Sequence, residues 1–148
     1  MAATAWQLYN SGKRYIGNGT IELGVGNFKM ALLTSASNTS TFTLSTFASL
    51  TSEISATGGY VTGGKALVPG TGQWTTGASA KQMKFTYSTV GVTFTASGAP
   101  LTNVKYAVIY QSGGKLLCFC QLSSTQFTVA SPNTLTVLPA ATGVFTLT

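Results

Sequence analysis

Acidic and imidazole side chains are almost absent from this sequence. There is no histidine, and the acidic residues number 2, both of them glutamates, Glu22 and Glu53. General acid–base catalysis near neutral pH normally uses histidine, a tuned carboxylate or a lysine, so few candidates for proton transfer exist. Two carboxylates could serve a glycosidase, but no other feature marks a cleft around either one. The sequence therefore predicts a protein that is not an enzyme and has no catalytic residues.

Signals for metals, cofactors and disulfides are equally scarce. The 2 cysteines, Cys118 and Cys120, lie in an apolar segment. A metal site built on Cys-x-Cys would need further ligands, which a chain without histidine or aspartate does not offer. Residues two apart on a strand point to the same face. We therefore expect two small apolar side chains in a reduced protein, with no metal site and no cofactor.

Charge of either sign is rare, at 7% of residues, and the formal net charge is +6. The basic residues are scattered, and only Lys13 and Arg14 are adjacent. A nucleic-acid interface normally needs a basic patch or stripe, although Tyr106 and Tyr110 beside Lys105 could stack on bases. Alternation along a strand makes these tyrosines part of an ordinary packing stripe instead. The sequence thus argues against nucleic acid as a partner.

Long apolar runs are also missing. No stretch of about eighteen apolar residues could cross a membrane, and the first twenty residues lack the apolar core of a signal peptide. We therefore expect no membrane partner, and synthesis and assembly in the cytoplasm.

One glycine-rich segment comes close to a known phosphate-binding motif. Gly59 to Ala66 nearly spells G-x-x-x-x-G-K-[ST], but Ala66 lacks the hydroxyl that holds magnesium in that motif. The motif must also open a helix after a buried strand, and the following residues do not read as a helix. We interpret the segment as a glycine-rich turn.

The residues that are abundant are those of strands and turns. The sequence has 17 glycines and many Ser, Thr, Val, Ile, Phe and Tyr residues, which favour short strands separated by turns. The predicted strands cover residues 21–25, 28–34, 81–87, 90–95, 104–110, 115–122, 127–129, 135–138 and 144–147. Residues 104–110 and 115–122, joined by Gln-Ser-Gly-Gly, predict a hairpin at the centre of the core. This pattern predicts an all-β, single-domain antiparallel β-sandwich, jelly-roll-like in form.

Two segments depart from the strand pattern. Phe47, Leu50 and Ile54 follow Ser45 at helical spacing, so we expect at most one short helix near residues 46–54. Residues 1–19 mix aromatic side chains with Asn, Ser and Gly without clean periodicity. They are predicted to form an N-terminal arm or edge segment, and residues 20–148 the β-sandwich domain.

The order and spacing of several segments resemble a family of small structural proteins of tailed bacteriophages. These segments are Asn27 to Ser35, Glu53-Ile54, Gly59-Tyr60, Gly63 to Leu67, Lys105 to Tyr110 and Gly143 to Thr148. The resemblance extends from about residue 9 to residue 148. It implies a virion component, a head decoration or cement protein, and supplies no active site.

A decoration protein would bind the major capsid protein and copies of itself through a few aromatic or arginine anchors. Trp6, Tyr9, Arg14 and Tyr15 in the arm are the predicted interface residues, unless they complete the core of the domain itself. The alternative is a tail or tail-fibre component with a receptor-binding role. In that case an exposed aromatic residue such as Trp74 would meet a cell-surface glycan.

Overall fold

A computed structural model describes residues 3–68 and 73–148. These residues contain short strands, one α-helix and one turn of 3-10 helix. The strands are β1 (Gln7–Leu8), β2 (Phe28–Leu33), β3 (Lys65–Ala66), β4 (Trp74–Thr76), β5 (Met83–Phe85), β6 (Val92–Thr95), β7 (Leu101–Val104), β8 (Tyr106–Gln111), β9 (Lys115–Gln121), β10 (Phe127–Val129), β11 (Thr134–Val137) and β12 (Phe145–Leu147). The helices are α1 (Asn10–Gly17) and η1 (Phe47–Ser49). All strand pairings are antiparallel, so the predicted all-β class is confirmed.

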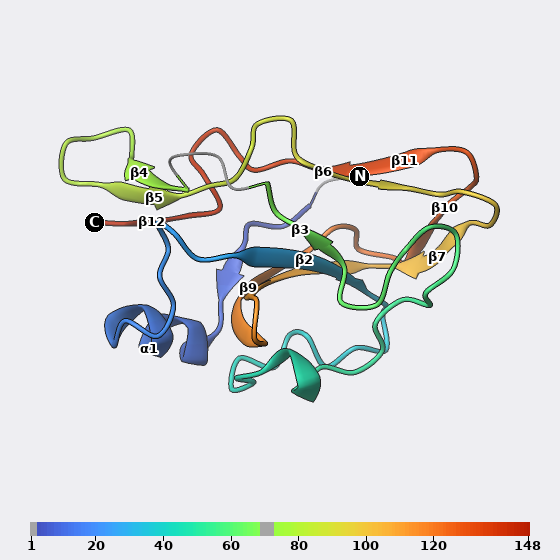
Figure 1. Ribbon diagram of the computed structural model, residues 1–148, viewed down its shortest axis with the longest axis horizontal. Coiled ribbons are helices and arrows are strands. Elements are labelled where there is room, and N and C mark those ends of the chain that lie inside the picture. The colour runs from blue at the N-terminus through green and yellow to red at the C-terminus, as the bar shows by residue number, and fades with distance from the viewer. Residues whose placement is uncertain (1–2, 69–72) are drawn as a thin grey trace.

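The chain is arranged in layers around one main sheet. This sheet has the order β1-β9-β8-β2-β3. On one side of it lie shorter ladders, among them β6 with β11 and β4 with β5 and β12; on the other side lie α1 and the loop that contains η1 (Figure 1). The predicted sandwich-like packing is therefore present, although the second β layer consists of separate short ladders.

Both faces of the main sheet are buried. In β2, Met30 and Leu32 belong to the larger core cluster, beneath the short ladders, whereas Ala31 and Leu33 belong to a second, smaller cluster. A strand covered on both faces has to be apolar at every position rather than alternating, which explains the run Met-Ala-Leu-Leu. The predicted hairpin forms from β8 and β9 and lies at the centre of this core.

A β-bulge in β9 sets the position of the N-terminal helix. Tyr110 pairs with Leu116, but Ile109 pairs with Cys118, so Leu117 is the extra residue. The backbone N–H of Tyr9 donates to the Leu117 carbonyl at 3.1 Å. One turn later, a Cβ atom on Gly12 would lie 2.5 Å from the same carbonyl oxygen. The helix therefore packs backbone against backbone on the bulge, which only glycine permits.

The helix α1 lies where no helix was predicted. Residues 10–17 were expected to be part of an N-terminal arm or edge segment, yet they form 8 helical residues. The buried positions of α1 are the small residues Ser11 and Gly12, and only Tyr15 and Ile16 in its last turn add apolar contact with the larger core cluster. The expected apolar periodicity is therefore missing from the sequence.

The predicted helix near residues 46–54 is only one 3-10 turn, η1. Phe47 and Leu50 pack against the second core cluster, as a helical face would. However, Ile54 donates its N–H to the Leu32 carbonyl at 3.1 Å, and Glu53 forms an isolated bridge with Leu33. The end of β2 thus holds these residues extended and prevents the helix from continuing.

The predicted strand over residues 21–25 is wrong. Ile21 and Leu23 are buried and Glu22 is exposed, which mimics strand alternation. The backbone instead turns on itself, with the Gly26 N–H donating to the Glu22 carbonyl at 2.7 Å. No neighbouring strand pairs with these residues among those described.

The other predicted strands are present with shifted bounds. The predicted strand 104–110 is divided, because Val104 ends β7 and Tyr106 begins β8. Strands β1, β3, β4 and β7 were not predicted, and all of them are only two to four residues long.

We expect Gly12→Ala to destabilise the fold by about 1–3 kcal/mol, because the added methyl group overlaps the backbone of β9. Gly17→Ala is the matched control: nothing lies within 4 Å of its Cβ position, so it should be neutral or stabilise α1 by up to about 1 kcal/mol. Urea unfolding of both variants measures the difference. Equal effects of the two substitutions would contradict this account of helix docking.

Candidate functional site

The two glutamates have different structural roles. Glu53 is half-buried, and its Oε1 accepts hydrogen bonds from the Tyr60 hydroxyl at 2.6 Å and from the Gly63 N–H at 2.7 Å. Glu22 is exposed in the turn before β2. Among the described residues there is no group of three His, Cys, Asp or Glu side chains that could hold a metal ion.

The glycine-rich segment is a turn, as predicted. Gly64 has φ of +73°, and a Cβ on it would collide with the Met30 carbonyl. The segment leads directly into β3 rather than into a helix. The Gly63 N–H, which a phosphate-binding loop would turn toward its ligand, already donates to Glu53. The anion that this loop binds is therefore a side chain of the protein itself.

Two buried tyrosines complete this network. Tyr60 accepts a hydrogen bond from the Leu32 N–H at 3.0 Å while donating to Glu53, and burial raises the pKa of its hydroxyl, with the Glu53 bond adding to the shift. Tyr110 donates to the Gly63 carbonyl at 2.6 Å and stacks on Phe47 with ring centroids 4.2 Å apart. The network ties the glycine turn to β2 and β8.

The residues considered for stacking on bases pack within the protein. Tyr110 and Val108 belong to the second core cluster, and Tyr106 packs against it. This confirms the packing stripe. The Lys105 ammonium lies over the Tyr106 ring at 5.4 Å from its centroid. Trp74, the candidate for glycan contact, is half-buried and packs near Phe145.

The cysteines share one face of β9, as predicted. Cys118 and Cys120 are free and belong to the larger core cluster. Burial raises the pKa of both thiols, that of Cys120 from 9.0 to about 12. Both side chains are therefore neutral and unreactive within the folded protein at neutral pH.

The four predicted interface residues do not form one patch. Tyr9 is fully buried, and its hydroxyl donates to the Thr39 carbonyl at 2.8 Å, so Tyr9 completes the core of the domain. Arg14 is exposed on α1, with its guanidinium 5.3 Å from the Tyr15 ring centroid. Tyr15 is half-buried against the larger core cluster. Trp6 alone of the four lines a groove.

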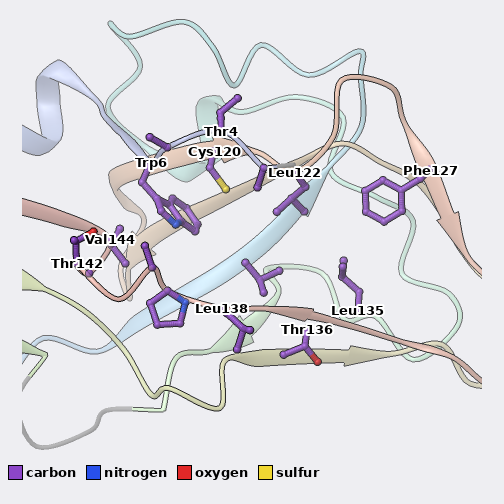
Figure 2. A pocket seen from close by; sticks show the side chains of 16 residues that line it. Thr4, Trp6, Cys120, Leu122, Phe127, Leu135, Thr136, Leu138, Thr142 and Val144 are labelled. Carbon is purple, nitrogen blue, oxygen red and sulfur yellow. The ribbon is translucent and has the colours of Figure 1, made fainter. Parts of the chain in front are cut away.

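This groove, with a volume of about 510 Å³, is the candidate functional site. One wall is the N-terminal segment 3–6, and the other is formed by residues 135–137 of β11 and the segment that follows it (Figure 2). Between them lie Cys120, Leu122 and Phe127. Among the residues that the structure describes, no Lys, Arg, Asp or Glu lines the groove. The sequence predicted Trp6 as a contact residue, but the groove itself depends on which strand edge remains open, and no sequence pattern marks that.

Hydrogen bonds to Gln121 at the end of β9 hold the N-terminal wall in place. The Thr4 N–H donates to the Gln121 carbonyl at 2.8 Å, and the Gln121 N–H donates to the Thr4 Oγ1 at 3.0 Å. The strand β1 then adds only two residues to the edge of β9.

Neither helix among the described residues has the length and hydropathy needed to span a membrane.

Comparison of the chain with known protein families, with characterised proteins and with solved structures finds no match.

We expect Glu53→Ala to destabilise the protein by about 2–4 kcal/mol, because it leaves the Tyr60 hydroxyl and the Gly63 N–H without an acceptor. Glu22→Ala, the same change at an exposed position, should stay within about 0.5 kcal/mol. Urea unfolding compares the two. A smaller effect at Glu53 than at Glu22 would show that the network does not support the fold.

The raised pKa values of Cys118 and Cys120 predict alkaline sensitivity. The folded state keeps both thiols protonated, so their contribution is complete below pH 9 and is lost as the pH rises toward 12. Between pH 9 and 10 we expect a loss of about 2 kcal/mol from the free energy of unfolding for the two thiols together. The double variant Cys118→Ala/Cys120→Ala should lack this loss. Urea unfolding at both pH values measures this loss. An equal loss of unfolding free energy in the double variant would contradict the prediction.

Proposed function

We propose that this chain is a non-enzymatic structural protein of a tailed-bacteriophage virion, a decoration or cement protein on the outer surface of the head. Its partners are the major capsid protein and copies of itself, and it stabilises the shell by protein–protein contacts. The observation that carries the proposal is the groove, whose mostly apolar lining offers contact surface and, among the described residues, includes no charged side chain. The segment order described above adds support through its resemblance to small phage structural proteins.

The composition of the chain suits a protein that works by contact. With 7% charged residues, little charge has to be removed from water when its surface is covered. Interfaces are enriched in aromatic residues and arginine at their centres, and Trp6 and Arg14 are such residues with exposed area. They act as separate anchors, one in the groove and one on α1.

The anchors are best tested by single substitutions. Deleting the N-terminal segment would also remove Tyr9, which is 0% exposed, and would damage the fold itself. Arg14→Ala has a matched control in Lys13→Ala, because Lys13 is the neighbouring exposed residue with the same charge.

We expect Trp6→Ala and Arg14→Ala each to weaken binding to capsids of the encoding phage at least tenfold, or by about 1.4 kcal/mol. Lys13→Ala should bind like the unmodified protein. Co-sedimentation with purified capsids that lack the protein measures the affinities, and circular dichroism confirms that each variant is folded.

Electron microscopy of labelled particles then places the protein. Label on the outer face of the head supports the proposal. Label on the tail or its fibres would replace it with the receptor-binding alternative, and unlabelled particles would refute a virion role.

A further inference from the structure

The groove runs along the edge of a strand. Leu135, Thr136 and Val137 of β11 line it in succession, although successive side chains of a strand point to opposite faces. A groove over one face would be lined by every second residue only. Figure 2 shows Leu135, Thr136 and Leu138 along one side of the groove, with Trp6 and Leu122 across from them.

The hydrogen-bond pattern of β11 shows which backbone groups face this groove. β11 pairs with β6 in the register Thr134↔Thr95 to Val137↔Val92. The Ala96 N–H donates to the Asn133 carbonyl at 2.9 Å, which makes the opposed residues Ala96 and Asn133 a hydrogen-bonded pair. Such pairs alternate along an antiparallel ladder. Thr134 and Thr136 are therefore in the pairs whose N–H and C=O groups point away from β6.

These outward-facing backbone groups have no partner within the described part of the chain. Thr136 forms a side-chain hydrogen bond, between its Oγ1 and that of Thr93 at 2.9 Å, which leaves its backbone groups unpaired among the described residues. β11 also carries no lysine, whereas β3, at an edge of the main sheet, carries Lys65. Charged residues on an edge strand prevent pairing with other chains. The edge of β11 lacks that protection.

We propose that this groove binds an extended, uncharged segment of a partner protein, which adds as a strand to β11 and places its side chains on the apolar floor. The inference rests on the proposed function for the identity of the partner, a subunit of the particle. Four residues of β11 correspond to about 13 Å of strand. The lining excludes charged occupants, since a charge there would lose its water without gaining a counter-ion.

Charge decides between a partner protein and a second copy of this chain. A second copy, with a net charge of +6 and Asp and Glu numbering 2, has few carboxylates to offer the basic residues of this chain. A partner with carboxylates flanking its extended segment would instead be attracted to the basic residues outside the groove. The occupant is therefore an uncharged strand with acidic flanks.

The position of Trp6 in the groove provides a direct assay. The sequence has 2 tryptophans, so Trp74→Phe leaves Trp6 as the only one and keeps an aromatic ring near Phe145. The probe is the synthetic peptide acetyl-Glu-Thr-Val-Thr-Val-Thr-Glu-amide. We expect saturable binding with a Kd below about 1 mM and a blue shift of the Trp6 emission as water leaves the groove.

Two matched comparisons test the mode of binding. Leu138→Lys places a charge on a groove residue that is 57% exposed, and Val90→Lys makes the same change at a residue that is 74% exposed and outside the groove. We expect Leu138→Lys to weaken peptide binding at least tenfold and Val90→Lys to leave it unchanged. A peptide of identical sequence, N-methylated at alternate residues, should not bind, because it cannot form the strand hydrogen bonds.

Absence of saturable binding, equal effects of the two lysine variants, or equal binding of the N-methylated peptide would overturn the proposal. So would a dimer in analytical ultracentrifugation that Leu138→Lys dissociates, because the occupant would then be a second copy. Peptide binding by a protein that fails to bind capsids would retain the strand-binding groove and refute the role on the head instead.

Discussion

The backbone of β2, β8 and β9 is hydrogen-bonded where water reaches neither face of the sheet. Each N–H and C=O in these strands needs a partner inside the protein, since an unpaired buried group would cost about 1–3 kcal/mol. The ladder that pairs β2 with β8 and β8 with β9 supplies these partners. The other elements cover both faces of this ladder and exclude water from it. The short ladders cover one face, and the η1 loop together with Tyr9 covers the other.

The scarcity of charge gives one carboxylate unusual importance. Glu53 joins the loop that covers the second core cluster to the glycine turn that precedes β3. Its carboxylate accepts hydrogen bonds from the Tyr60 hydroxyl and the Gly63 N–H, both in that turn region. In a chain with more acidic residues, such connections could be shared among several ion pairs. Here, hydroxyl and backbone groups take that role, as in the bonds from Tyr9 to Thr39 and from Tyr110 to Gly63.

The sequence was informative wherever side-chain pattern alone decides the structure. The apolar run in β2 and the hairpin of β8 and β9 could be predicted, because burial of a whole strand requires apolar residues throughout. The helix α1 could not, since it docks through Gly12 and Ser11 on a bulge that arises from pairing between distant segments. The turn at residues 21–25 imitates strand alternation without a partner strand. For the groove, only Trp6 was predicted, because an open strand edge is a property of the assembled sheet.

The bulge in β9 also determines what kind of sequence change this fold can absorb. Leu116 faces one core cluster while Leu117 and Cys118 face the other, so inserting or deleting one residue in β9 would exchange the contents of the two cores. At Gly12, the helix α1 packs against the backbone carbonyl of Leu117. A substitution in β9 that keeps the path of the main chain therefore preserves the contact with the helix, whatever it costs within the two close-packed cores. An insertion or deletion in β9, in contrast, would move the bulge away from α1 and break this contact.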